Sequence, residues 1–218
     1  MTVATPSVAA RYRYHSGDSC GTFMAAALRA YDPPLPPAAH VLEIGCAEYD
    51  WLTTAALSWP EMSFTGLDWR GCKTPPEGVT ILRGDARVYP FPEASFDWIV
   101  SISAMEHIGL GHYAQDPTDP DGDVTAFANA YRWLAPGGWF YFDVPWNAGP
   151  DAYEVVGASH RIYGDAEIQR RCHQGLPWVE RWRGVVGNGD TDQLLTHPPR
   201  LPGGERFYYC GLWYQKEL

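Results

Sequence analysis

The sequence lacks the features that mark secreted and membrane-spanning proteins. No run reaches the roughly 20 apolar residues that a membrane-spanning helix needs. Residues 1–10 have neither the basic start nor the apolar stretch of a signal peptide, so we expect none. The five cysteines are widely spaced and form no C-x-x-C pair, which is typical of reduced thiols. These absences predict a cytoplasmic protein without a membrane partner.

Positive charge is also scarce. The chain has 16 Lys and Arg against 26 Asp and Glu, which gives a formal net charge of -10 at pH 7. A nucleic acid held through its phosphates needs a basic surface, so we expect no nucleic-acid partner. The composition leaves the oligomeric state open, a homodimer included.

Internal repeats and signs of a second compact unit are missing as well. With 218 residues, of which 45% are hydrophobic, the chain is long enough for one α/β domain with a full core. Prolines concentrate in residues 32–37, where they end a helix and form a stiff linker. We therefore expect an N-terminal arm with a capping helix over 1–37 and a single domain over 38–218.

The stretch 40–51 is the one around which the chain is organised. Its apolar run at 41–44 is typical of a strand buried on both faces of a parallel sheet. Gly45 then lets the backbone turn sharply and approach a ligand, and Asp50 is a candidate N-cap for a helix over 51–57. Strand, glycine turn and helix form the first half of a nucleotide-binding βαβ unit, although an ordinary turn without a ligand has the same pattern.

Acidic residues follow the next two strands. Asp68 ends the strand over 62–68, where such folds hold ribose hydroxyls, because a carboxylate can accept both hydroxyl protons. It would repel a 2′-phosphate, which disfavours NADP. Asp85 follows the strand over 79–83; such an acid can accept from an adenine amine while the N–H of Ala86 meets a ring nitrogen. Both acids are equally typical of turns that face water.

The later part of the chain adds four more predicted strands and two helices. The strands are expected over 96–103, 139–145, 178–186 and 207–216, and the helices over 124–134 and 164–173. Residues 135–138 are expected to form a tight turn, residues 146–160 to be irregular, and residues 187–204 to form a long loop.

Four aspartates lie between residues 111 and 123, which suggests calcium. The glycine and the bidentate glutamate of an EF-hand loop are missing, so we expect no metal and interpret Asp121 or Asp123 as a helix N-cap.

Taken together, six motifs resemble the class I S-adenosylmethionine (SAM)-dependent methyltransferases. They are Val41–Cys46, Thr65–Asp68, Gly84–Ala86, Phe96–Val100, Met105–Ile108 and Trp133–Gly138, in the order and spacing of that family. The resemblance implies a doubly wound, mostly parallel seven-stranded sheet with an antiparallel last strand. Segments 106–113, 119–123 and 160–164 look like a narrower bacterial group that is often associated with surface-sugar biosynthesis. The glycine turn departs from acid-x-Gly-x-Gly-x-Gly, since Ala47 and Tyr49 occupy the later positions.

The resemblance implies SAM as cofactor and S-adenosylhomocysteine (SAH) as product. The cofactor-binding residues would be Glu43, Gly45, Cys46, Ala47, Asp68, Trp69, Asp85, Ala86, Ser101 and Ser103. The contacts to the methyl acceptor would be Tyr14, His15, Glu106, Trp146, Arg161 and Tyr163. A hydroxyl acceptor benefits from a base with a pKa near neutrality, so we predict His107 and His160 as catalytic residues. Of the two, we expect His107 to take the proton, because strand ends hold geometry more tightly than loops.

Three functions are compatible with these residues. The first is methyl transfer to a hydroxyl group of a small molecule or a sugar. The second is a SAM- or SAH-binding protein that has lost catalysis, which Ala47 and Tyr49 support. The third, a nicotinamide-dependent oxidoreductase, is disfavoured because no full G-x-G-x-x-G follows the first strand.

Overall fold

The computed structural model describes most of the chain. The described residues are 8–11, 19–47, 51–71, 75, 77–113, 116–149, 152–186, 194–195, 198, 201 and 207–218. Tyr14 and His15, predicted to contact the acceptor, lie outside these ranges, as do Tyr49 and the expected N-cap Asp50.

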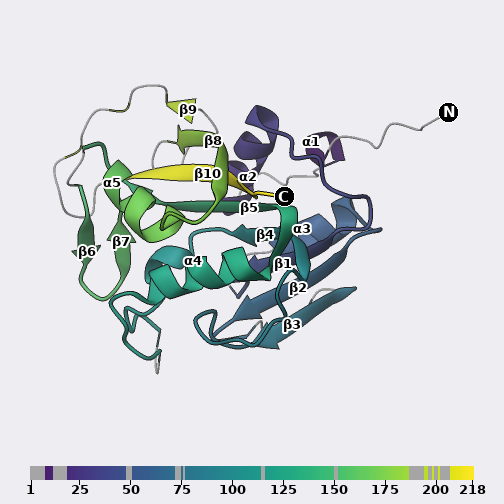
Figure 1. Cartoon of the computed structure of the whole chain (residues 1–218), viewed down its shortest axis with the longest axis horizontal. Helices are drawn as coiled ribbons and strands as arrows, with labels where there is room; N and C mark the ends of the chain where they lie inside the picture. The colour runs from purple at the N-terminus through teal and green to yellow at the C-terminus, as the bar shows by residue number, and fades with distance from the viewer. Residues whose placement is uncertain are drawn as a thin grey trace.

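The architecture is a mixed, mostly parallel sheet with helices on both faces (Figure 1). Its strands are β1 (His40–Ile44), β2 (Ser63–Asp68), β3 (Val79–Arg83), β4 (Phe96–Ser101), β5 (Leu134–Trp146), β8 (Trp178–Val186), β9 (Leu194–Leu195) and β10 (Tyr208–Lys216). Their order is β3-β2-β1-β4-β5-β10-β8-β9. The first five run parallel, and β10 is antiparallel to its neighbours β5 and β8. The predicted doubly wound sheet with an antiparallel last strand is thus confirmed, and the short β9 adds an eighth strand within the expected loop 187–204.

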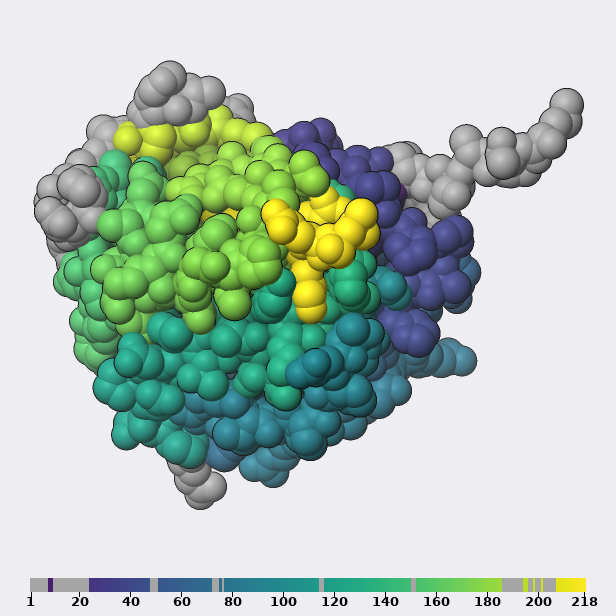
Figure 2. All heavy atoms as spheres, in the orientation of Figure 1, coloured from purple at the N-terminus to yellow at the C-terminus, as the bar shows by residue number. Residues whose placement is uncertain are grey.

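Apolar side chains alternate between the two covered faces of the sheet. On β4, Trp98 and Val100 pack towards α2 (Ser19–Ala30) and α3 (Trp51–Ser58), whereas Ile99 packs towards α4 (Gly122–Trp133) and η2 (Ile168–His173). Both cores are fully buried, as expected where helices cover a parallel sheet on both sides. Figure 2 shows the face of the molecule that is covered by α4, in teal, and by the segment that includes η2, in green.

The segment between β5 and β8 departs most from the sequence prediction. Residues 146–160 were expected to be irregular, but they include β6 (Glu154–Val156), which pairs antiparallel with β7 (His160–Ile162). Strands of three residues are too short to show an alternating pattern. The helix expected over 164–173 is the short α5 (Asp165–Glu167), which continues directly into the π-helical turn η2.

Two predicted boundaries shift for local reasons. β5 begins at Leu134 and includes the expected turn at 135–138, where Gly137 has φ 76° and the register against β4 changes. Asp121 occupies the N-cap position of α4 as predicted, but its side chain makes no capping hydrogen bond. The two remaining short helices are α1 (Val8–Arg11) and η1 (Met105–His107). None of the described helices is long and apolar enough to span a membrane.

The turn after β1 is built on a left-handed glycine. Gly45 has φ 89°, and a Cβ placed there would lie 2.2 Å from the Cβ of Ala104. Gly78 has a similar φ of 77° but open space around it. The two positions separate the cost of backbone strain from the cost of a steric clash.

We expect Gly45→Ala to lower the free energy of unfolding by more than 2 kcal/mol, roughly, because strain and clash act together. Gly78→Ala carries the strain alone and should cost about 1 kcal/mol. Urea unfolding of both variants measures the difference. Equal costs would mean that the turn and Ala104 move apart freely.

Candidate functional site

A cleft opens at the carboxyl ends of β1 to β4. The strand order reverses between β1 and β4, which is the place where open α/β sheets bind ligands. Six predicted cofactor residues line this cleft: Gly45, Asp68, Trp69, Asp85, Ala86 and Ser103. The predicted catalytic residue His107 lines it as well, together with Arg70, Tyr113 and Asp116, which the sequence analysis missed.

Four further predicted cofactor residues support the floor of the cleft. Glu43, Cys46 and Ser101 are buried, and the Ser101 hydroxyl donates to the carbonyl of Ile44 at 3.1 Å. The backbone N–H of Ala47 donates to Asp68 Oδ2 at 3.2 Å. These four residues therefore shape the turn after β1. The side chains that line the cleft come from the ends of the neighbouring strands and the segments that follow them.

Asp68 is held by its own neighbour. Its Oδ1 accepts the backbone N–H of Arg70 at 2.7 Å and lies 3.3 Å from Arg70 Nε, while Nη2 lies 3.5 Å from Oδ2. The same guanidinium lies 3.8 Å from the centre of the Tyr113 ring. Arg70 thus bridges the end of β2 and the loop after η1, and a ligand hydroxyl that reaches Asp68 must share its carboxylate with Arg70.

Asp85 has an arginine partner too. Its carboxylate accepts from Arg87 Nε at 2.9 Å and from Nη2 at 2.7 Å. Burial raises the pKa of Asp85, but the hydrogen bonds and charge of Arg87 outweigh it, so the pKa lies below its ordinary value. Arg87 also donates to the carbonyl of Pro117 and to Asp116, which ties the end of β3 to the loop across the cleft. An arginine two residues after the acid is the sequence signal for this pair.

Asp143 is a buried acid that the sequence analysis missed. Its Oδ1 accepts the N–H of Ser103 at 2.8 Å and the Ser103 hydroxyl at 3.1 Å. Ser103 has φ 45°, a strained conformation for a residue other than glycine, and these two bonds hold it there at the edge of the cleft. Burial, followed by the neighbouring charge of Glu106, raises the pKa of Asp143 to about 7.

Glu106 and His107 form a pair below the cleft. The His107 Nδ1 lies 2.5 Å from the carbonyl of Ser159; since a carbonyl only accepts, Nδ1 carries the proton. The opposite nitrogen, Nε2, lies 3.6 Å from Glu106 Oε1. Burial raises the pKa of Glu106 to about 8, against the lowering effects of a backbone hydrogen bond and the charge of Arg161. Glu106 is buried, so it acts beneath the surface of the cleft rather than on it.

The structure brings both predicted catalytic histidines into one corner. The rings of His107 and His160 have centroids 6.3 Å apart, and His107 stacks on His112 at 5.1 Å. His160 Nδ1 pairs with the Ser159 hydroxyl at 3.1 Å, and its ring packs on Phe207. Within the described ranges, no group of three or more His, Cys, Asp and Glu residues is placed to hold a metal ion.

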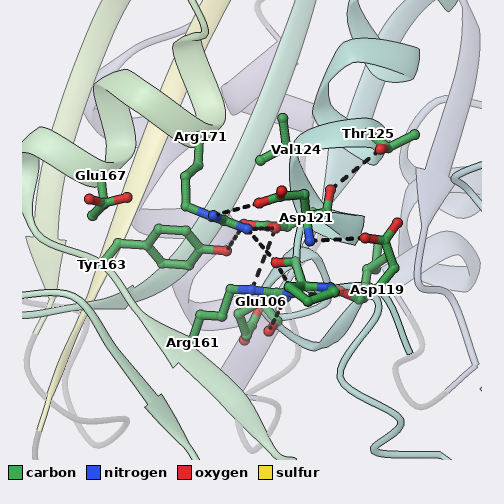
Figure 3. Close-up of polar contacts among 12 residues, drawn as sticks. Glu106, Asp119, Asp121, Val124, Thr125, Arg161, Tyr163, Glu167 and Arg171 are labelled. Atoms are coloured by element: carbon green, nitrogen blue, oxygen red, sulfur yellow. Dashed lines mark hydrogen bonds and ion pairs between the residues drawn. The ribbon is translucent and has the colours of Figure 1, made fainter. Parts of the chain in front are cut away.

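Arg161 lies away from the cleft, although the sequence predicted an acceptor contact. Its side chain is fully buried, and Nη1 donates to the carbonyls of Glu106 and Ile108 at 3.1 and 2.8 Å. Its Nε lies 3.4 Å from Asp123 Oδ1. Figure 3 shows the guanidinium groups of Arg161 and Arg171 converging from β7 and η2. A structural role therefore replaces the predicted contact.

Tyr163 and Trp146, two other predicted acceptor contacts, are also part of the protein interior. The Tyr163 hydroxyl donates to Asp123 Oδ2 at 2.9 Å, and the Trp146 indole N–H donates to Asp165 at 3.1 Å. Both side chains are buried, and neither lines the cleft. Aromatic residues after a strand end are typical of binding loops, but here Tyr163 satisfies the buried carboxylate of Asp123, and Trp146 donates to the exposed Asp165.

Comparisons with known proteins show which fold this chain shares. Among curated proteins, no sequence matches the chain. The model of a family described as a Caenorhabditis protein of unknown function (DUF268) matches residues 86–189. Solved structures match nearly the whole chain. One is a SAM-dependent methyltransferase of Methanosarcina mazei, 14% identical, with TM-score 0.58, covering 88% of this chain and 97% of that one.

Two more solved structures widen this group. The 1,6-didemethyltoxoflavin-N1-methyltransferase of Burkholderia thailandensis, solved with its substrate and SAH, is 17% identical, with TM-score 0.54, and covers 83% of this chain and 72% of that one. The 4+2 cyclase SpnF is 13% identical, with TM-score 0.59, and covers 91% of this chain and 81% of that one. The chain has the Rossmann-like fold that these methyltransferases and the cyclase share. Identity this low shows the fold, and function must be argued from the site.

The buried Glu106 makes stability depend on pH. Its pKa is about 8 in the folded protein, against an ordinary value of 4.5. Between these values the unfolded state binds fewer protons, so stability falls as pH rises. As pH rises from 5 to 8, the free energy of unfolding of Glu106→Gln should increase relative to that of the wild type, by on the order of 2 kcal/mol. Urea unfolding at both pH values tests this.

The matched control is the exposed Glu93, which lies before β4 at the opposite end of the strand. The difference between Glu93→Gln and wild type should stay flat between pH 5 and pH 8. A flat difference for Glu106→Gln as well would show that Glu106 is ionised normally in the folded protein.

Proposed function

We propose that this chain is a SAM-dependent methyltransferase that acts on a small-molecule acceptor, at a hydroxyl group of a sugar or a similar compound. The observation that carries the proposal is one cleft lined by the left-handed turn at Gly45, by Asp68 after β2 and by Asp85 after β3. The fold supports it, since solved structures of this fold include SAM-dependent methyltransferases. The net charge of -10 favours a small acceptor over a nucleic acid.

The residues present fit the cofactor. The turn at Gly45 requires glycine, because its φ is 89° and a Cβ there would collide with Ala104, and both residues line the cleft. Asp68 would accept the ribose hydroxyls, with Arg70 sharing its carboxylate. Asp85, held ionised by Arg87, would face the adenine amine, and the N–H of Ala86 would face the ring. When bound, the cofactor supplies an activated methyl group, so the protein has mainly to position the acceptor.

The residues proposed to act on the methyl acceptor include a group that can take up a proton. The Ser159 carbonyl holds the proton of His107 on Nδ1, which leaves Nε2 to take up a proton beside Glu106 Oε1. Once Glu106 is ionised, which its raised pKa places near pH 8, its carboxylate would stabilise the charged form of the imidazole. We therefore keep His107 as the proposed base and give His160, beside it, a role in contacting the acceptor. The sugar acceptor itself is supported by the sequence segments alone.

Cofactor binding provides the first test of this function. Asp68→Ala should weaken SAH binding by about 1.5–3 kcal/mol, because it removes charge-assisted hydrogen bonds in a partly buried site. Isothermal titration calorimetry measures the change. Asp97→Ala is the matched control, since this carboxylate accepts the N–H of His40 at the opposite edge of the sheet. Unchanged affinity in Asp68→Ala would remove Asp68 from the site.

Turnover provides the second test. A screen with methyl-labelled cofactor over sugars, nucleotide sugars and phenols first identifies an acceptor. His107→Ala should then lower the rate by roughly 10²–10⁴, the usual effect of losing a general base, with SAH affinity retained. Full turnover in His107→Ala with loss in His160→Ala would reverse the two roles. Full turnover in both variants would exclude a histidine base, and SAH binding without any labelled product would favour the non-catalytic protein.

A further inference from the structure

Two carboxylates lie buried near the cleft. Glu106 and Asp143 are each about 1% exposed, and the charge of Glu106 raises the pKa of Asp143. Asp143 on β5 holds both polar groups of Ser103, which lines the cleft, and also accepts from the Tyr141 hydroxyl at 3.3 Å. Glu106 is followed at once by His107, which lines the cleft as well. Each carboxylate is therefore next to a residue that lines the cleft: Asp143 bonds to Ser103, and Glu106 precedes His107.

Glu106 is poorly satisfied for a purely structural residue. Its Oε2 is buried and has no hydrogen-bond partner within the part of the chain that the structure describes. Its Oε1 faces His107 Nε2 at 3.6 Å, which is longer than a hydrogen bond. A buried carboxylate oxygen without a partner costs stability, and a glutamine or an apolar residue would avoid this cost. The ionised carboxylate therefore lacks a full set of partners and would be stabilised by a cation bound near it.

The elements packed on η1 are α4, β5 and β7. Arg161 on β7 and Asp143 on β5 interact electrostatically with Glu106, and His107 Nε2 lies 3.6 Å from its Oε1. The same three elements also carry the titratable groups His160, Tyr141 and Asp123. The charge of Arg161 lowers the pKa of Glu106, but its guanidinium donates to backbone carbonyls and pairs with Asp123. Burial raises the pKa of Glu106 to about 8 and that of Asp143 to about 7, so the pair exchanges protons near neutral pH.

We propose that Glu106 and Asp143 act as a charge sensor beneath the cleft, which makes the cleft prefer the sulfonium cation of the cofactor over its uncharged thioether product. The inference rests on the proposed function and adds a specificity determinant to it. A cation in the cleft favours the ionised carboxylates, so its binding drives a proton from the pair into solvent. The neutral thioether does not. The preference for the cation therefore grows as pH rises through neutrality.

Proton release measures this coupling directly. Calorimetry with SAM and with SAH at pH 7.5, in two buffers of different ionisation enthalpy, gives the protons released on binding. The wild type should release more protons with SAM than with SAH, and Glu106→Gln should lose most of this difference. Between pH 6.5 and pH 8.5, the SAM-to-SAH affinity ratio should rise about three- to tenfold more in the wild type than in Glu106→Gln.

A control variant separates the titration of the buried carboxylates from that of the ligands. Glu93→Gln, which changes an exposed carboxylate far from the cleft, should behave as the wild type. The amino group of each ligand titrates equally with every variant, so it cancels in the comparison. If Glu106→Gln does not fold, Asp143→Asn takes its place, because asparagine keeps an oxygen for Ser103.

The outcomes separate this inference from the proposed function. In one outcome, the wild type and the buried-site variant each bind SAM and SAH and show the same difference in proton release between the two ligands. That result overturns the sensor and leaves the methyltransferase proposal standing. Failure of the wild type to bind either ligand overturns both. A release difference that is present in the wild type and in Glu93→Gln but lost in Glu106→Gln supports the sensor.

Discussion

A single buried carboxylate, that of Asp123, joins α4 to the segment around β7 and η2. It accepts from the Tyr163 hydroxyl and from Arg171 Nε, and it pairs with Arg161 Nε. Through these partners the first turn of α4 is joined to β7 and η2 (Figure 3). Removing one member of a buried ion pair typically costs about 3–5 kcal/mol, because the remaining charge is left uncompensated. The β6–β7 hairpin, and with it the Ser159 carbonyl that orients His107, therefore depends on this network.

The cleft at the carboxyl ends of β1 to β4 is held together differently. Asp68 and Asp85 stand at the ends of parallel strands, whose backbone bonds hold these positions in place. Each acid has an arginine two residues later, and each arginine reaches across to the loop after η1, Arg70 through Tyr113 and Arg87 through Pro117. The two acids at the strand ends and the loop after η1 are thus linked through their arginines.

The buried pair Glu106 and Asp143 lies where these two halves meet. Strained or poorly satisfied groups persist only when the surrounding structure over-determines them, and they concentrate at functional sites. Ser103 in a left-handed conformation, Glu106 with a buried orphan oxygen and Asp143 below them fit that pattern. The fold accepts lower stability at neutral pH at the point where a charged ligand would be recognised.

Sequence alone determined the parts of this protein that depend on neighbours along the chain. Apolar runs located β1 to β4, the glycine turn located Gly45, and the acids after β2 and β3 located two walls of the cleft, because each is a local pattern with a local physical cause. Only the tertiary structure decided the roles of Arg161, Tyr163 and Asp143. Arg161 and Tyr163, which the sequence predicts at the acceptor, instead pair with the carboxylate of Asp123, about 40 positions away in sequence. Asp143 gives no signal in the sequence, because it lies in a strand rich in aromatic residues. A buried charge is stabilised by whichever partner packing brings to it, and that partner is set by the fold as a whole.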